Sequence, residues 1–365
     1  MTAPTASQGF SAEAARRSRR PVLVLDLGGT WFRAGVLTAD GTVVAQRRDP
    51  ALTVTTHPGS VTGLQHRITD WLVRTADALA PGLAAIGGAP LCAVSLGAAM
   101  NGLTGEVLGS APLFGSASTS WWPAAELATR RPGLRWSVVN DVSALAYALL
   151  VDTALPRHGK AAALTVSTGI AYRTIDLATG HVPLDPHHGL QGEIGHLPAQ
   201  LTWEGRPVAA HCDCGAPDHV AALASGAGIG RFLRSLPAET WGGRTGPGTD
   251  PVAAFTDRAA AGHPGALRVL DAVTLPLARV LLAQATLDPE VGLTVLTGGV
   301  VDGLGDVYLD SLLRNLAQPG PYGIADRDRD YFTGRIVRGR PDGLTALRGA
   351  GVHARGIPNE RVHSP

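Results

Sequence analysis

The chain has few cysteines, almost no net charge and no long apolar run. Only 3 of its 365 residues are Cys, too few for the disulfide framework of a small secreted domain. Lys plus Arg number 31 and Asp plus Glu number 30, so nothing indicates nucleic acid or an anionic membrane as a partner. No run of about eighteen apolar residues occurs, which argues against a membrane-spanning helix.

The N-terminal segment 1–20 carries several arginines, but no apolar segment with a cleavage site follows them. We therefore expect a disordered tail rather than a signal peptide, and a cytoplasmic protein. A chain of this length exceeds one ordinary core, so two domains are expected. The predicted division is a smaller N-terminal α/β lobe over 21–140 and a larger C-terminal α/β lobe over 141–365, whose last helix could return to the first lobe.

The segment 189–226, GLQGEIGHLPAQLTWEGRPVAAHCDCGAPDHVAALASG, holds two of the three cysteines and three histidines. Two thiols and two imidazoles are the ligands of a closed, tetrahedral structural zinc site. The predicted ligand set is His196, Cys212, Cys214 and His219. His211 or Asp213 could replace one of these ligands. Two unrelated thiols beside exposed histidines are the other interpretation of this segment.

The segment PVLVLDLGGTWFRAGV, 21–36, predicts a strand, a Gly-rich turn and a second strand. Glycines let a backbone approach a phosphate closely, and Thr and Arg side chains add donors. Asp26 at the end of the first strand could hold Mg²⁺ directly or through water. A tight turn without a ligand is the alternative. The candidate nucleotide-binding residues here are Asp26, Gly28, Gly29, Thr30 and Arg33.

The segment 160–182, KAAALTVSTGIAYRTIDLATGHV, repeats the strand–turn–strand organisation of 21–44. Two such units, one in each half, are expected to face each other across a cleft and hold a polyphosphate. A Gly-Gly pair at a later strand–helix junction could seat a nucleotide against backbone amides, although a plain turn explains it equally well. The candidate residues of this half are Thr168, Gly169, Gly298 and Gly299.

The segment 135–150, RWSVVNDVSALAYALL, predicts a short strand followed by a helix. The helix is expected to be capped by Asn140 or Asp141. Polar groups at the carboxyl end of a strand lie where α/β sheets bind ligands. Capping alone needs only one of the two residues, so the other could face a substrate.

Five motifs occur in the order seen in the ROK family of sugar kinases, repressors and open reading frames. They are DLGGTWFRAGV, VNDVSALAYA, GLQGEIGHLP, CDCGAPDHVAALASG and VLTGGVV. The chain resembles this family over roughly 22–354. The resemblance implies an α/β, actin-like ATPase (ribonuclease H-like) fold with two lobes around a central cleft. It also implies a homodimeric kinase that transfers phosphate from ATP, with Mg²⁺, to the 6-hydroxyl of a hexose or amino sugar.

The resemblance gives roles to single residues. Asp141 resembles the general base, and zinc is implied as a structural ion that fixes the loop carrying the sugar ligands. The implied sugar-binding residues are Asn101, Asn140, Glu193 and His196.

The chain also departs from the family pattern. The family usually has a third Cys in place of His219, and a sugar-contacting Glu in place of Ala221. The second phosphate turn is usually richer in glycine than Ser167, Ala171 and Arg173 make it. Arg173 could contact phosphate or obstruct it.

These departures leave several alternatives open. The acceptor could be glucose, glucosamine, N-acetylmannosamine or kanosamine, and polyphosphate could replace ATP as the donor. A non-catalytic sugar-binding regulator with a degenerate site is the main alternative function. A different ATPase or an acetate-type kinase on the same fold is the other. The segment 1–20 is too short for the winged helix of the family's repressors, so DNA binding is not expected.

Overall fold

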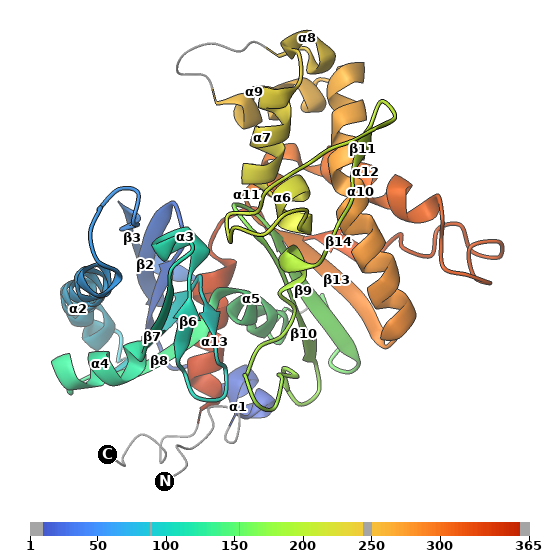
Figure 1. Cartoon of the computed structure of the whole chain (residues 1–365). Coiled ribbons are helices and arrows are strands. Elements are labelled where there is room, and N and C mark those ends of the chain that lie inside the picture. The colour runs from blue at the N-terminus through green and yellow to red at the C-terminus, as the bar shows by residue number, and fades with distance from the viewer. Residues whose placement is uncertain (1–9, 88–89, 153, 244–249, 358–365) are drawn as a thin grey trace. The chain divides into compact units, whose positions relative to one another are not determined.

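The computed structural model describes residues 10–87, 90–152, 154–243 and 250–357 (Figure 1). Contacts divide the chain into two compact units. The first consists of Met1–Gly159, Arg173–Gln191 and Asp342–Pro365, and the second of Lys160–Tyr172 and Gly192–Pro341. This division differs from a single boundary at residue 140, because helices α5 (Asp141–Leu149) and α13 (Thr345–Gly356) both pack within the first unit.

The first unit is built on a five-stranded sheet with the order β3-β2-β1-β4-β8. Strand β1 pairs antiparallel with β2 and parallel with β4, which pairs parallel with β8. These strands are β1 Val22–Leu27, β2 Trp31–Leu37, β3 Val43–Pro50, β4 Leu91–Leu96 and β8 Arg135–Asn140. A smaller three-stranded sheet contains β5 Ala99–Met100, β6 Val107–Gly109 and β7 Ser118–Trp121.

Helices cover both faces of the five-stranded sheet. Leu25 of β1 shares a core with Leu72 of α2 (Val61–Ala85) on one face. Val24 faces α13 on the other, where a Cβ at Gly351 would lie 3.1 Å from its Cγ1. Because both faces are buried, β1 and β4 do not alternate apolar with polar residues, and each is apolar except for one buried polar residue near its carboxyl end, Asp26 and Ser95. The other helices of this unit are α1 Ala12–Arg17, α3 Ala111–Phe114 and α4 Pro123–Arg130.

Helix α13 lies directly on α5. A Cβ at Gly349 would come within 1.7 Å of the Ala144 carbonyl oxygen, so no larger residue fits there without a backbone shift. This close approach fixes the axis of α5 against the sheet, and with it the residues at the start of α5.

The prediction of a disordered tail over 1–20 is wrong for its described part, while residues 1–9 lie outside the described residues. Helix α1 begins after Ser11, which caps it. The Phe10 ring lies 4.9 Å from that of Tyr147 and 5.8 Å from that of His353. A six-residue helix is too short to give a periodic apolar pattern, and contacts with distant residues hold it in place.

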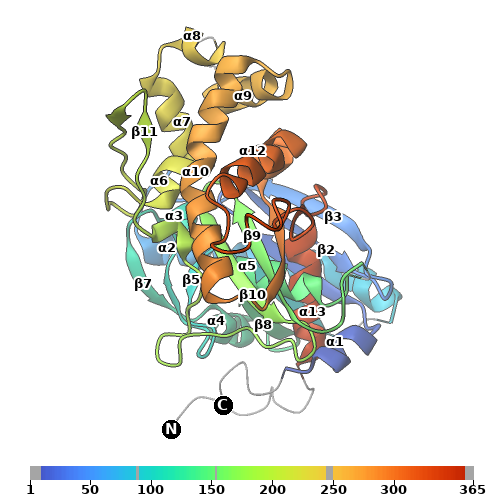
Figure 2. The same cartoon turned by 90° about the vertical axis from the view of Figure 1, so that its right-hand side faces the viewer.

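The second unit contains a four-stranded sheet with the order β10-β9-β13-β14, in which β13 is parallel to β9 and β14. None of the described helices, including the long α10 that runs through this unit (Figure 2), is long and apolar enough to cross a membrane. The strands are β9 Lys160–Val166, β10 Ile170–Asp176, β11 Thr202–Trp203, β12 Arg206–Pro207, β13 Val291–Thr297 and β14 Ile336–Arg338. The helices are η1 Ile194–His196, α6 Val220–Ala224, α7 Gly226–Ser235, α8 Ala238–Trp241, α9 Pro251–Ala260, α10 Pro264–Leu287, α11 Gly299–Leu304 and α12 Asp306–Ala317.

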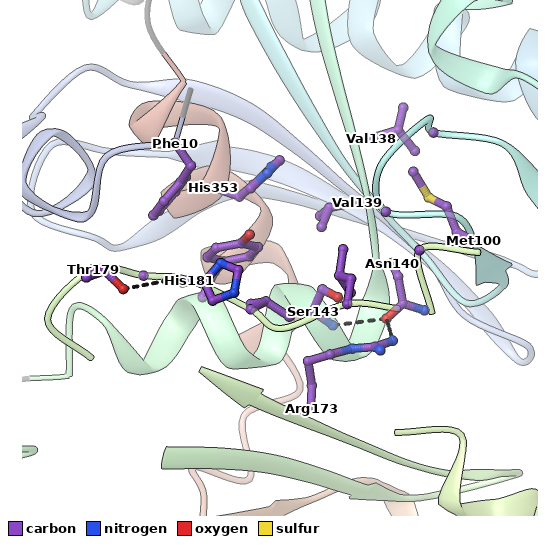
Figure 3. Close-up of a pocket in the computed structure, with 17 residues that line it drawn as sticks. Phe10, Met100, Val138, Val139, Asn140, Ser143, Arg173, Thr179, His181 and His353 are labelled. Atoms are coloured by element: carbon purple, nitrogen blue, oxygen red, sulfur yellow. Dashed lines mark hydrogen bonds between the residues drawn. The ribbon is translucent and has the colours of Figure 1, made fainter. Parts of the chain in front are cut away.

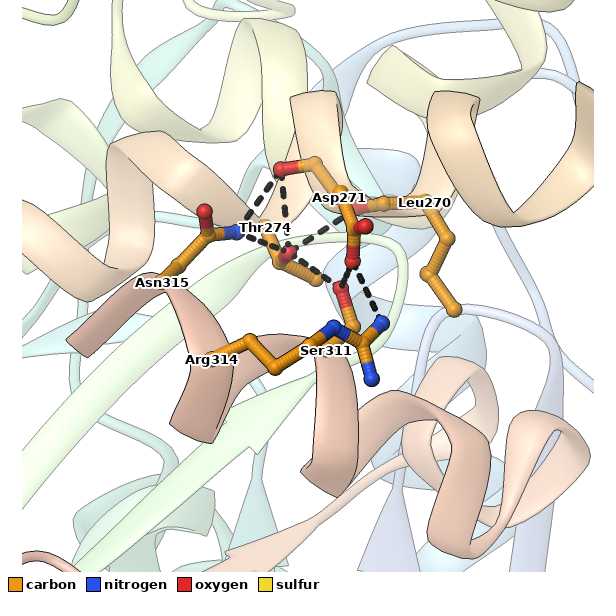
Figure 4. Close-up of polar contacts among 6 residues, drawn as sticks. All are labelled: Leu270, Asp271, Thr274, Ser311, Arg314 and Asn315. Atoms are coloured by element: carbon orange, nitrogen blue, oxygen red, sulfur yellow. Dashed lines mark hydrogen bonds and ion pairs between the residues drawn. The ribbon is translucent and has the colours of Figure 1, made fainter. Parts of the chain in front are cut away.

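A polar network joins α10 to α12 (Figure 4). Ser311 Oγ donates to Asp271 Oδ1 at 2.6 Å and lies 2.8 Å from Thr274 Oγ1. Arg314 donates to the same carboxylate oxygen at 2.7 Å, and Asn315 Nδ2 donates to the Asp271 carbonyl oxygen at 2.7 Å. Ser311 and Thr274 are fully buried, so their hydroxyls must find partners inside the protein. The network thereby fixes α12 on α10.

His353 of α13 is buried beside α5. Its ring lies 4.6 Å from that of Tyr147, and Ser137 Oγ lies 3.1 Å from its Nδ1. Burial lowers the pKa of His353 from the ordinary 6.5 to about 4, because the charged imidazolium would lose its hydration. The folded protein therefore holds this side chain neutral.

This burial predicts a loss of stability in acid. Between about pH 6.5 and pH 4 the unfolded chain binds a proton at His353 that the folded protein does not bind. The free energy of unfolding should therefore fall as the pH falls through this window, by up to roughly 3 kcal/mol. Thermal midpoints measured from pH 7 to pH 4 should decline more steeply for the unaltered protein than for His353→Gln. Parallel curves would contradict the assignment.

Candidate functional site

Polar residues of the first unit gather at the carboxyl ends of β1, β4 and β8. These parallel strands are neighbours, and their register places Asp26 opposite Ser95 and Leu96 opposite Asn140. Asp141 follows directly as the first residue of α5. The carboxyl ends of parallel strands are the usual ligand-binding edge of an α/β sheet. The fold therefore brings together residues from three separate motifs.

The side-chain amide of Asn140 makes several hydrogen bonds at the junction between β8 and α5 (Figure 3). Its Oδ1 accepts from Ser143 N at 3.0 Å, so Asn140, not Asp141, caps the helix. The same oxygen accepts from Arg173 at 2.9 Å. Its Nδ2 donates to the Ala98 carbonyl oxygen at 2.8 Å and to Asp141 Oδ1 at 3.0 Å. Four protein groups thus engage the amide that the sequence suggested for sugar binding.

Two donors hold the Oδ1 oxygen of the Asp141 carboxylate. Oδ1 accepts from Val142 N at 2.9 Å as well as from Asn140. Oδ2 points toward Gly97, where a Cβ would lie 3.4 Å from it and 3.2 Å from the Leu27 carbonyl oxygen. Gly97 thus lies in close contact with both Oδ2 and the Leu27 carbonyl oxygen, and a side chain there would crowd the carboxylate.

Asp26 is buried and hydrogen-bonded. Its Oδ1 accepts from Ser95 Oγ at 2.8 Å and its Oδ2 from Arg33 at 3.2 Å. Burial raises the pKa of Asp26, while the Ser95 hydroxyl and the Arg33 guanidinium oppose this rise. Arg33 therefore pairs with Asp26 in this structure.

The turn after β1 combines packing with exposure. A Cβ at Gly29 would lie 2.7 Å from Pro112 Cβ, so packing alone requires a small residue there. Gly28 N donates to the Trp31 carbonyl oxygen, and Thr30 is exposed. Thr30 is thus the member of this turn whose hydroxyl is open to a ligand.

Asn101 forms a turn of the first unit. Its Oδ1 accepts from Leu103 N at 2.9 Å and Thr104 N at 3.1 Å. It is buried beside Gly189, whose backbone leaves no room for a Cβ against the amide. The structure gives its carbonyl oxygen a local role in the turn.

The predicted nucleotide residues of the second unit also come together. The Ser167–Gly169 turn links β9 to β10, and Gly226 N donates to the Ser167 carbonyl oxygen at 2.8 Å. A Cβ at Gly298 would lie 2.5 Å from the Val166 carbonyl oxygen, and its φ of 105° also favours glycine. The turn after β9 and the turn after β13 therefore meet at one end of this sheet.

Open space lies over part of these turns. A Cβ at Gly169 or Gly299 would meet no atom within 4 Å, and Thr168 is exposed. Their backbone amides and the Thr168 hydroxyl are thus accessible to a ligand.

The four predicted zinc ligands form one cluster. All four ligand atoms lie within 4.8 Å of one another. Distances of 3.4 Å between the two Nδ1 atoms and 3.4 Å between Cys214 Sγ and His219 Nδ1 fit a tetrahedral ion. Burial raises the pKa of the Cys212 thiol, a shift that a bound cation would oppose. The candidate ligands that the structure brings together are His196, Cys212, Cys214 and His219.

Two backbone hydrogen bonds tie the ligand-bearing segments together, from Ala199 N to the Asp218 carbonyl oxygen and from Val220 N to that of Leu197. His211 and Asp213 are outside the cluster. Asp213 pairs instead with Arg231 at 2.8 Å.

Glu193 and Ala221 lie next to this cluster. Glu193 is half-buried at the start of η1, the turn that ends at His196. Ala221 follows His219 in α6, and a Cβ at Gly195 of η1 would lie 3.4 Å from the Ala221 Cβ. The position that the family fills with a glutamate thus borders the turn that carries Glu193.

Three residues of these sites were missed or left undecided by sequence reasoning. Ser95 was detectable as a lone polar residue in the apolar run of β4. Gly97 had no signal besides following that strand. Arg173, for which a phosphate contact and an obstruction were both left open, donates through its guanidinium to Asn140 Oδ1 and to the Gln191 carbonyl oxygen.

The fold and motifs define a ROK protein. The model of the ROK family matches residues 22–319, so the chain belongs to the ROK family. A ROK family glucokinase from Streptomyces griseus, solved with glucose and AMPPNP, has a TM-score of 0.64 and 18% identity, covering 91% of this chain and 98% of its own. The fold is therefore that of the ROK sugar kinases, the actin-like ATPase fold expected from the sequence.

Curated relatives are similar over most of this chain. The 2-epi-5-epi-valiolone 7-kinase of Actinoplanes sp. strain SE50/110 is 41% identical over 351 residues, 93% of this chain and 94% of the relative. The C(7)-cyclitol 7-kinase of Streptomyces hygroscopicus subsp. jinggangensis is 30% identical over 320 residues, 83% of this chain and 86% of the relative.

Proposed function

We propose that this protein is an ATP-dependent kinase that phosphorylates the 7-hydroxyl of a C7-cyclitol of the 2-epi-5-epi-valiolone type. The observation that carries this proposal is the 41% identity, over nearly the whole chain, to a kinase named for that substrate. Asp141 at the β8–α5 junction supplies the base that such a reaction needs.

The cyclitol replaces the hexose or amino sugar expected from the sequence. A seven-carbon cyclitol with a six-membered ring has one exocyclic carbon, and its hydroxyl corresponds to the 6-hydroxyl of a hexose. The cyclitol has no ring oxygen and therefore no anomeric hydroxyl. Ala221, where family members have a sugar-contacting glutamate, suits an acceptor that has a ketone in place of the anomeric hydroxyl, because a ketone cannot donate a hydrogen bond to a carboxylate.

The proposed chemistry is a direct transfer. Asp141 Oδ2 accepts the proton of the 7-hydroxyl while its oxygen forms a bond to the γ-phosphorus of ATP and the bond from that phosphorus to the β,γ-bridging oxygen breaks. Asn140 Nδ2 and Val142 N donate to Oδ1 at 3.0 and 2.9 Å. These two hydrogen bonds fix the orientation of the carboxylate, and Oδ2 is the oxygen assigned to the substrate hydroxyl. The products are the 7-phosphate, ADP and a proton.

ATP is assigned to the turns of the second unit, where the Thr168 hydroxyl and the backbone amides of Gly169 and Gly299 are accessible donors for phosphate oxygens. In the first unit, taken by itself, the exposed Thr30 hydroxyl is a candidate phosphate donor. Asp26 and its partner Ser95 could hold a water of Mg²⁺, which supplies positive charge to the β- and γ-phosphates when bound.

Replacing the base should abolish turnover. Asp141→Asn keeps the size and the hydrogen bonds to Oδ1 but cannot accept the proton, so kcat should fall by about 10²-fold or more. Coupled ADP release, measured with 2-epi-5-epi-valiolone, glucose and kanosamine, tests both the acceptor and the base.

The matched control is Asp77→Asn, which alters an exposed ion pair with Arg131 in the same unit and should leave kcat unchanged. A preference for a hexose would contradict the cyclitol assignment. Full activity of Asp141→Asn would contradict the role of Asp141.

Restoring the family glutamate should shift specificity. Ala221→Glu would return an acceptor for a hydroxyl pair, and a hydrogen bond to a charged group is worth about 1.5–3 kcal/mol. The ratio of kcat/KM for glucose to kcat/KM for the cyclitol should rise about tenfold or more, and less for the neutral Ala221→Gln. An unchanged ratio in both variants would show that this position does not select the acceptor.

We also propose that His196, Cys212, Cys214 and His219 hold a structural zinc ion that fixes η1 and Glu193. Cys212→Ser and Cys214→Ser should each lose zinc, measured by elemental analysis of purified protein, and lower the thermal midpoint by several degrees. His211→Gln, next to the cluster but outside it, is the control and should keep stoichiometric zinc. Absence of zinc from the unaltered protein would refute this site.

A further inference from the structure

We propose that Arg173 is a positioning residue for phosphoryl transfer, which acts through the Asn140 amide to orient the Asp141 carboxylate. The inference rests on the proposed function and adds a residue to its machinery. It starts from a chain of contacts within the first unit, from the Arg173 guanidinium to Asn140 Oδ1 at 2.9 Å and from Asn140 Nδ2 to Asp141 Oδ1 at 3.0 Å.

Burial and a backbone contact hold the Arg173 guanidinium in one orientation toward Asn140. It is 2% exposed, and its guanidinium also donates to the Gln191 carbonyl oxygen. A buried guanidinium fixed at a backbone oxygen has little rotational freedom. It therefore presents a fixed, charged donor to Asn140. Figure 3 shows this contact, with Arg173 below α5 in the view.

A guanidinium carries only donors. The atom of Asn140 that faces it must therefore be the oxygen, and the nitrogen must turn to the other side. Ser143 N requires the same orientation from the helix side at 3.0 Å. Arg173 adds a charged donor to this neutral one, and charged hydrogen bonds are roughly twice as strong. An amide rotated by 180° would place its NH₂ group against both donors.

The orientation of the Asn140 amide decides which oxygen of Asp141 reacts. With Nδ2 toward Asp141, Oδ1 has a donor, and Oδ2 lies on the side of Gly97. With the amide rotated, Asn140 would offer an acceptor to a carboxylate, and repulsion would turn the carboxylate away. Arg173 thus maintains the orientation of the Asp141 carboxylate through Asn140, although Arg173 does not contact the substrate.

The cavity beside Asn140 supports an indirect role. It measures about 270 Å³ and is lined by Arg173, Asn140 and Ser143, whereas Asp141 is not among its lining residues. Arg173 thus lies on the side of Asn140 away from the carboxylate, and its influence on Asp141 passes through the amide.

The test compares two arginines of the first unit that both donate to backbone carbonyl oxygens. Arg16 donates to the carbonyl oxygens of Leu150, at 3.1 Å, and Leu177, and has no bond to Asn140. Arg173→Met should lower kcat about tenfold to a hundredfold, with the KM for ATP unchanged within about twofold. Arg16→Met should lower the thermal midpoint but leave kcat unchanged. Arg173→Lys keeps the charge without the planar fork and should retain an intermediate kcat.

A double-mutant cycle tests whether the effect passes through Asn140. Once Asn140→Ala has removed the amide, Arg173→Met should change kcat by no more than about twofold, so the two effects are not additive. Additive losses, or an Arg173→Met enzyme with the kcat of the Arg16→Met enzyme, would overturn the proposal. If Arg173→Met does not fold, Arg173→Lys carries the same comparison in both backgrounds.

Crystal structures of the variants give a readout without turnover. We expect the Asn140 amide to leave Asp141 in Arg173→Met and to keep its place in Arg16→Met; an undisturbed amide in both would overturn the proposal. Kinetics use whichever acceptor the unaltered protein phosphorylates. Absence of turnover with every acceptor contradicts the proposed function, whereas turnover that is insensitive to Arg173 contradicts only the positioning role.

Discussion

The structure of the first unit depends on one amide, that of Asn140, at the point where β8 ends and α5 begins. This side chain caps the helix, ties it to the loop after β4 through the Ala98 carbonyl oxygen, and donates to the carboxylate of the next residue. Three structural elements are thereby fixed to one another by a single planar group. Because the amide is planar, fixing its oxygen also fixes its nitrogen, and the position of Asp141 follows.

The surrounding fold supports this junction from two sides. Helix α13 packs on α5 closely enough to require Gly349. The buried Arg173 guanidinium donates to the Asn140 amide oxygen. The arginine is a departure from the glycine-rich turn of the family, and sequence reasoning could interpret it only as a phosphate ligand or an obstruction. The positioning role that we propose rests instead on a long side chain that reaches a partner 33 positions away in the sequence.

Much of this organisation was predictable because it is local. Asp141 beside a helix cap, the glycines of the candidate phosphate turns in each unit and the four candidate metal ligands are all encoded by short motifs. The described structure brings the four candidate ligands into one cluster. The rest depends on contacts between distant segments. Helix α1, the return of α13 to the first unit and the Asn140–Arg173 bond have no local signal, since each is fixed by packing or hydrogen bonding across more than thirty residues. The cyclitol acceptor that we propose could not be read from the sequence alone, because it rests on the names of curated relatives together with the missing glutamate at Ala221.

We propose that Asp141 offers Oδ2 to the hydroxyl that is phosphorylated while Asn140 Nδ2 stays bonded to Oδ1. A crystal structure with a C7-cyclitol and a non-hydrolysable ATP analogue tests this proposal most directly. We expect the 7-hydroxyl oxygen within about 2.6–3.2 Å of Asp141 Oδ2, with Asn140 Nδ2 still on Oδ1. A cyclitol bound with its 7-hydroxyl on another residue, or an Asp141 carboxylate turned away from the ligand, would contradict it.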